Sequence, residues 1–205
     1  MRPNYAQDAP PTEISVGGFA YPCETDYRVW LEVVRRTEEL CLNDESEAGR
    51  ERLAGQIIEL EAMVFGGVLS EEDPADVLRA ISEFAGGYPA APVRTHPHEQ
   101  TVSYDWDLNE IIIAIRDQHG VDLSYRRVEP FHWWEFLLLF RTLAGDHYIL
   151  NLMEIRGYKG KDPELRRLKL DHALPERYTA DELREYEAFS KMFEAADEEA
   201  EESDE

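Results

Sequence analysis

The chain has few of the features expected of a secreted or membrane-spanning protein. Its two cysteines, Cys23 and Cys41, show no C-x-x-C spacing and follow no signal peptide. We therefore expect free thiols in a reducing cytoplasm, and nothing in the sequence supports a bridge between them. The longest apolar stretch, residues 131–143, is interrupted by His132, Glu135 and Arg141 and is too short to span a bilayer. No membrane partner is expected.

Positive charge is also scarce. The 205 residues include 21 Lys and Arg against 44 Asp and Glu, which gives a net charge of −23. Residues 181–205 hold 12 acidic and 2 basic residues, so this segment alone contributes −10. Such an acidic surface repels phosphate backbones, and no nucleic-acid partner is expected. The charge suits either a basic protein partner or solubility alone, and both readings stay open.

Catalytic motifs are missing from the sequence. There is no Gly-x-Ser-x-Gly motif and no phosphate-binding loop, and neither cysteine has a histidine beside it. With 44 carboxylates, close acidic pairs arise by chance and are no evidence of hydrolase chemistry. The sequence therefore predicts a protein that is not an enzyme, with no catalytic residues and no cofactor.

Several short motifs resemble metal-binding or nucleic-acid-binding sites, but each lacks residues or elements that such a site requires. His132 and Glu135 share a helical face, but further ligands are not apparent, so a histidine hydrogen-bonded within its own turn or to a carboxylate is favoured. The pair of histidines in residues 96–98 lies in a proline-rich loop without a third ligand. Residues 105–116 open like a calcium loop but lack the glycine and the final glutamate. Residues 157–160 resemble a Gly-x-x-Gly nucleic-acid clamp but lack its strands, so a tight turn is expected.

Apolar periodicity predicts a mainly α fold. A hydrophobic fraction of 43% with 22 aromatic residues can build a core. Two short alternating runs flank Gly17 and Gly18 and predict a β-hairpin over residues 14–21. Ser70 is expected to cap the third helix, Asp107 to begin the fourth with Glu110 as its capping-box partner, and Pro130 to begin the fifth. The expected helices cover residues 26–42, 45–63, 70–85, 107–119, 130–143, 148–155, 163–169 and 179–196.

The fold class expected is thus a roughly seven-helix, bundle-like domain with one short N-terminal β-hairpin and a disordered acidic C-terminal tail. Residues 1–13 are predicted to form a flexible arm. Residues 14–180 are expected to form a single mainly helical domain, with a candidate linker at residues 86–103, where glycines and prolines forbid a regular helix. Two readings of this linker stay open: a separator of an N-terminal and a C-terminal helical half, or a flexible surface loop within one domain. Residues 181–205 are expected to begin as a helix and run into the disordered tail.

Two adjacent tryptophans mark the most apolar segment. Trp133 and Trp134 point about 100° apart on a helix, so one narrow stripe cannot bury both. One could face the core and the other a partner, or the helix could be covered on all sides. Full burial within the subunit is favoured, because three consecutive leucines follow at residues 137–139.

The same region carries a family resemblance. Its pattern is Tyr104-x-x-Asp107, Gly120-Val121-Asp122-Leu123, His132-Trp133-Trp134-x-Phe136 and Ile155-Arg156-Gly157-Tyr158. This pattern resembles the "gene product fifteen" family of phages with long, non-contractile tails, and the likeness runs from about residue 14 to about residue 189. It implies a structural or partner-binding role for Tyr104, Asp107, Gly120, Asp122, His132, Trp133, Trp134, Phe136, Gly157 and Tyr158.

The resemblance also implies a function. In such phages the gene lies between those of the tail tube and the tape measure, which implies a tail-assembly chaperone of the host cytoplasm. It would bind and solubilise the tape-measure protein and assist tube assembly, with the major tail protein as a further partner. Self-association stays open. The alternatives are a structural minor tail component retained in the virion, and an acidic DNA mimic that inhibits a host protein.

Overall fold

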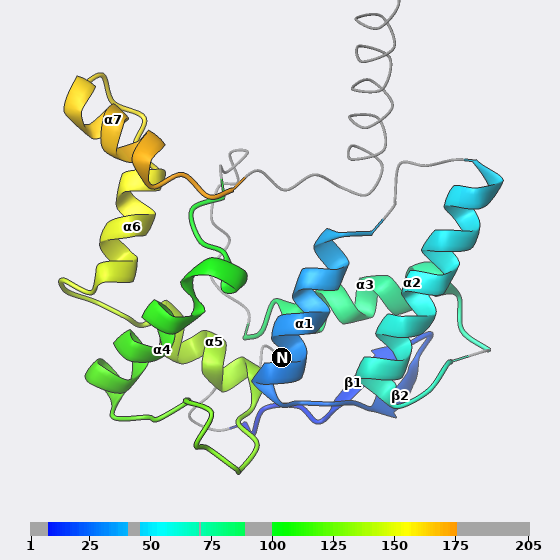
Figure 1. Cartoon of the computed structure of the whole chain (residues 1–205). Helices are drawn as coiled ribbons and strands as arrows, with labels where there is room; N and C mark the ends of the chain where they lie inside the picture. Colours follow the sequence, from blue (N-terminus) through cyan, green and yellow to red (C-terminus); the bar gives the residue numbers. More distant parts are fainter. Residues whose placement is uncertain (1–7, 41–45, 70, 89–99, 176–205) are drawn as a thin grey trace, which may run out of the picture.

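The computed structural model describes residues 8–40, 46–69, 71–88 and 100–175, and in these residues a β-hairpin precedes seven helices (Figure 1). Strands β1 (Glu13–Val16) and β2 (Phe19–Pro22) pair antiparallel around Gly17 and Gly18, which both have positive φ. The predicted mainly α fold with one hairpin is confirmed. The helices are α1 (Tyr27–Glu38), α2 (Glu47–Phe65), α3 (Pro74–Ala85), α4 (Tyr104–His119), α5 (Trp133–Arg141), α6 (Tyr148–Arg156) and α7 (Pro163–Asp171).

Three predicted helix starts are wrong. Asp73, not Ser70, is the N-cap of α3, because its carboxylate accepts a hydrogen bond from the Ala75 backbone N–H at 2.8 Å. α4 begins at Tyr104 rather than Asp107, since Asp107 is buried inside the helix and accepts from the Ser103 backbone N–H at 2.9 Å. α5 begins at Trp133, three residues after Pro130, with His132 as its N-cap.

Several predictions fall on residues outside the described part of the chain. These are the arm over residues 1–7, residues 89–99 of the candidate linker, and the helix and acidic tail expected beyond residue 175. Cys41 also lies outside it, whereas Cys23 is a free thiol. Burial raises the pKa of Cys23 to about 12.

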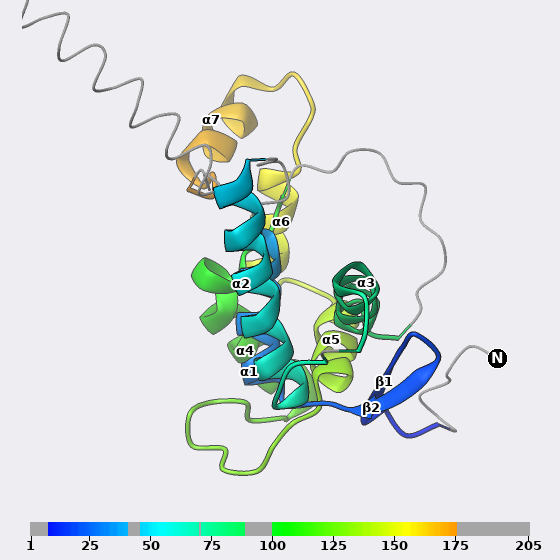
Figure 2. The ribbon, with the colours of Figure 1, turned by 90° about the vertical axis from the view of Figure 1, so that its right-hand side faces the viewer.

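Helix α1 lies at the centre of the molecule and contacts α2, α3 and α5 (Figures 1 and 2). The hairpin packs on α3 through β1, α4 packs on α5 and α6, and α7 packs on α6. One hydrophobic core therefore includes side chains from both sides of residues 89–99. Its fully buried members include Trp30, Leu60, Ile81, Ile111, Ile115, Trp133, Phe136 and Ile149.

The starts of α1 and α5 are joined by their backbones. The Tyr27 N–H donates to the Phe131 carbonyl at 2.8 Å, and the Trp133 N–H donates to the Thr25 carbonyl at 2.7 Å. These bonds form an antiparallel bridge just ahead of the two helices. They bring segments about a hundred residues apart in the sequence into fixed register.

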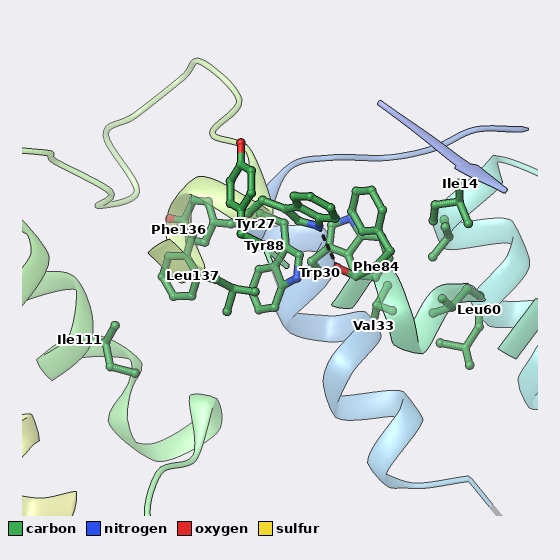
Figure 3. Close-up of a cluster of buried hydrophobic side chains, with 14 of the residues drawn as sticks. Ile14, Tyr27, Trp30, Val33, Leu60, Phe84, Tyr88, Ile111, Phe136 and Leu137 are labelled. Atoms are coloured by element: carbon green, nitrogen blue, oxygen red, sulfur yellow. Dashed lines mark hydrogen bonds between the residues drawn. The ribbon is translucent and has the colours of Figure 1, made fainter. Parts of the chain in front are cut away.

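Stacked aromatic rings fill the space between α1, α3 and α5 (Figure 3). Trp30 stacks on Phe84 with ring centroids 4.6 Å apart, and Phe136 stacks on Tyr27 at 5.1 Å and on Trp133 at 5.4 Å. Such pairs stabilise a core by about 0.5–1.5 kcal/mol beyond the area that they bury. The aromatic cluster therefore sets how the three helices sit against one another.

Both adjacent tryptophans are buried, as predicted, with 1% and 8% of Trp133 and Trp134 exposed. Each indole N–H donates to a backbone carbonyl at the end of α3: Trp133 to Ala85 at 3.0 Å and Trp134 to Phe84 at 2.8 Å. The last carbonyls of a helix lack partners within it, and a buried indole N–H needs an acceptor. The Trp133 bond meets both requirements, whereas the Phe84 carbonyl also accepts from the Gly87 backbone N–H at 3.0 Å, so the Trp134 bond is its second.

Arg141 completes this helix end. Its guanidinium donates to the Gly86 carbonyl at 2.6 Å and to the Tyr88 carbonyl at 3.0 Å. A cation at the C-terminal end of a helix is also favoured by the helix dipole. Three side chains of α5 thus hold the C-terminal end of α3.

We predict that Trp133→Phe lowers the free energy of unfolding by about 1–3 kcal/mol, because it removes the indole donor from the half-buried Ala85 carbonyl. Guanidinium denaturation would measure the change. Trp106→Phe is the matched control, since the Trp106 side chain is 61% exposed and its replacement should have little effect. A loss no larger than that of the control would contradict the assignment.

Candidate partner-binding site

A buried ion pair joins two of the family motifs. Arg156, at the end of α6, donates to both carboxylate oxygens of Asp107 on α4, at 2.6 and 3.1 Å. The two side chains are 9% and 4% exposed. Arg156 also donates to the Thr101 and His172 carbonyls at 3.1 and 2.8 Å. The forked guanidinium therefore holds α4, α6 and the chain after α7 together.

His132 is held in one protonation state by its neighbours. The Trp134 backbone N–H lies 3.0 Å from Nδ1, and the Pro11 carbonyl oxygen lies 2.9 Å from Nε2. A backbone N–H can only donate and a carbonyl can only accept, so Nδ1 accepts, Nε2 carries the proton and the ring is neutral. Burial lowers the pKa of His132 in the same direction. No three His, Cys, Asp or Glu residues of the described chain come together in a way that could hold a metal ion.

The Gly-Val-Asp-Leu motif builds the turn after α4. Gly120 ends the helix in the left-handed conformation, with φ of 71°. The Asp122 carboxylate accepts from the Ser124 backbone N–H at 2.9 Å, and this bond lowers the pKa of Asp122. Leu123 is buried, and its carbonyl accepts from the Tyr27 hydroxyl at 2.5 Å. The motif fixes where the chain leaves α4.

Gly157 and Tyr158 shape the turn between α6 and α7. A Cβ on Gly157 would lie 3.1 Å from the Met153 carbonyl oxygen, which leaves little room for a side chain. The Tyr158 hydroxyl accepts from the Asp162 N–H at 3.1 Å, and its ring lies against Gly160. The expected tight turn accounts for these residues.

A groove of about 450 Å³ lies between α1 and α4. Half-buried Leu31, Tyr104 and Leu108 supply its apolar lining, and burial raises the pKa of Tyr104 to about 12. Tyr104 also contacts the aromatic cluster, with its ring 6.1 Å from that of Phe136. The groove therefore rests directly on the core.

Trp106 stands in this groove with 61% of its side chain exposed. A large aromatic side chain at the edge of a groove is typical of a binding anchor. The prediction from sequence did not single out Trp106, although it lies inside the Tyr104-x-x-Asp107 motif. Its helical position could have indicated that it is exposed, because it lies away from the face of α4 on which Asp107 and Ile111 are buried.

The rim of the groove carries both signs of charge, held in fixed positions. Arg28 pairs with Asp26 at 2.7 Å, while Arg35 pairs with Glu32 at 2.5 Å and with Glu39 at 2.8 Å. Hydrogen bonds from Arg35 lower the pKa of Glu32 to about 2 and so keep it ionised. A rim of this kind suits a partner segment with charges of both signs beside an apolar stripe.

The buried ion pair predicts a large effect for Asp107→Asn. Removing the carboxylate leaves Arg156 buried without its counter-charge, which should cost about 3–5 kcal/mol of stability. Asp117→Asn on the same helix is the control, because its pair with Arg116 is more than half exposed and should contribute about 0–1 kcal/mol. Equal losses in urea denaturation would refute the role assigned to Asp107.

His132 predicts a dependence of stability on pH. The pKa of His132 is lower in the folded chain than its unfolded value of about 6.5. Its contribution to stability is therefore complete above the unfolded pKa and is lost as the pH falls from there through the lower, folded pKa. Stability should therefore drop between about pH 7 and about pH 5. His132→Asn keeps an acceptor for the Trp134 N–H but does not titrate, and its stability curve should be flatter over this range. Parallel curves would count against the neutral histidine.

Among the described residues, no helix is both long and apolar enough to cross a membrane. No curated protein and no solved structure matches the chain. The family model described as "Bacteriophage Gp15 protein" matches residues 80–178, from the second half of α3 to beyond α7. The matched region contains all the motif residues described above and the α4 side of the groove, whereas the hairpin, α1 and α2 precede it. Over these residues, just under half of the chain, the protein is similar to the bacteriophage Gp15 protein family.

Proposed function

We propose that this protein is a phage tail-assembly chaperone that binds an amphipathic helix of the tape-measure protein in the groove between α1 and α4. The match to this family over residues 80–178 suggests a structural or tail-related phage protein. The more specific role rests on the exposed Trp106 in its groove. No catalysis is involved, and the host cytoplasm, where tails are built, is the proposed location.

The groove supports this role physically. An amphipathic helix places apolar residues along one face, at spacings of three and four, and such a face docks in an apolar groove. Leu31, Tyr104 and Leu108 offer the apolar surface, and Trp106 offers a wide, rigid anchor. The charged rim can then pair with polar residues that flank the apolar face of the partner.

The surface charge supports the same role. A long helix with an exposed apolar face aggregates unless something covers that face. A cover with a net charge of −23 would repel other copies of the complex and keep it in solution. The same charge makes nucleic acid an unfavourable ligand.

The arrangement of the carboxylates gives less support to a DNA mimic. On α1, Glu32 and Glu39 are paired with Arg35, and Arg36 reaches Glu59 on α2. Carboxylates neutralised in this way do not present a row of free negative charge. A structural tail component is the remaining alternative, and purified virions would distinguish it by mass spectrometry, because a chaperone should be absent from them.

The test is co-expression with the tape-measure protein of the same phage, followed by pull-down and a binding titration. Wild-type chain should yield a soluble complex, and Trp106→Ala should weaken binding by about tenfold or more, as expected for an aromatic anchor. Val128→Ala is the control, since Val128 is 89% exposed on the loop between α4 and α5 and lies outside the groove.

Two outcomes would contradict the proposal at different levels. If Trp106→Ala binds as tightly as wild type, the groove is not the binding site. If wild type gives neither a complex nor a gain in solubility, the chaperone role fails.

A further inference from the structure

Helix α7 has no buried side chain. Leu165, Leu168 and Leu170 are 38%, 39% and 77% exposed. Its ties to the rest of the chain are largely polar, and include the Lys169 ammonium on the Tyr158 carbonyl at 3.2 Å. A nine-residue helix is marginal in water on its own, so exposed leucines here call for a covering surface.

The α7 region is also basic in an acidic protein. Residues 159–171 contain five Lys and Arg against three Asp and Glu, a net charge of +2. On α7 itself, Leu170 lies on the same side as Arg166 and Arg167, by helical spacing. Arg167 is 84% exposed, and its guanidinium lies 3.9 Å from the Asp171 carboxylate. The helix therefore presents an apolar residue between two cations.

A second groove, of about 420 Å³, lies along α2 and the segment that leads into α3. Its lining includes Leu53, Ile57, Ile58, Val68 and Leu69. Ile58 and Val68 are 49% and 52% exposed. This α2 groove is separate from the α1–α4 groove and shares no lining residue with it.

The surroundings of the α2 groove have the opposite charge to α7. Residues 46–76 contain eight Asp and Glu and two Arg, a net charge of −6. Glu61 and Glu72 line the groove, and Arg50 stands among the lining residues as the counter-charge. An apolar groove with an acidic surround fits a helix that offers leucine beside arginine.

We propose that α7 of one copy docks in the α2 groove of a second copy. The two elements lie on opposite sides of the molecule in Figure 1, with α7 at the upper left and α2 at the right. Contact between such unlike surfaces is head to tail, so it generates rings or open filaments rather than closed pairs. One short helix buries little area, and each contact is accordingly weak and dependent on concentration. This association concerns the chain alone and does not rest on the proposed tape-measure binding.

The test uses the full chain and three variants at exposed positions. Leu170→Asp removes the apolar anchor on α7, and Ile58→Asp places a charge in the α2 groove. Val128→Asp is the control, because Val128 belongs neither to α7 nor to the α2 groove. Sedimentation of wild type should give a mass that rises with concentration above the 23.7 kDa of one chain. Leu170→Asp and Ile58→Asp should each stay at 23.7 kDa, while Val128→Asp should behave as wild type.

Mixing the two defective variants separates this proposal from other modes of association. Leu170→Asp retains the groove and Ile58→Asp retains α7, so the mixture has one working contact and should form a one-to-one pair that cannot extend. Circular dichroism would verify that both variants are folded. The proposal is overturned if wild type stays a monomer at every concentration, if either variant associates as wild type does, or if the mixture forms no pair.

Discussion

The C-terminal end of α3 and the paired tryptophans of α5 are joined by hydrogen bonds that each side needs. A helix that ends in the core leaves carbonyls without donors, and two buried indoles bring donors without acceptors. The bond from Trp133 to Ala85 meets both needs, and the bond from Trp134 to Phe84 adds to the one that the Phe84 carbonyl accepts from the Gly87 N–H. Because these bonds fix α5 against α3, the aromatic cluster, the central α1 and the groove beside it take their positions from this contact.

A second constraint acts on the C-terminal half. Asp107 and Arg156 are charges that cannot be left unpaired in the core, and each is costly without the other. Their pairing sets where α4 lies relative to α6, and hence where the far wall of the α1–α4 groove stands. The motif residues for which contacts are described above therefore act chiefly on the fold, while Trp106 between them stays exposed to solvent.

The sequence predicted what depends on local periodicity and missed what depends on distant partners. The hairpin and the helices within the described residues follow from alternation and apolar stripes, and Gly120 marks its helix end through its own backbone freedom. The pairing of Asp107 with Arg156 spans 49 positions, and no local pattern encodes it. The same limit explains the start of α4, because Ser103 could be recognised as its cap only once Asp107 was known to be buried. A groove between α1 and α4 likewise needs both helices in place.

The four tryptophans lie in two different environments, so their intrinsic fluorescence can report on two parts of the structure. Trp30, Trp133 and Trp134 are buried, and each donates its indole N–H to a backbone carbonyl. Trp106 alone among the four is largely in contact with solvent. Fluorescence from the first three reports on the integrity of the core, whereas quenching by a soluble agent acts mainly on Trp106. Folding and occupation of the α1–α4 groove can therefore be followed separately in one unlabelled sample.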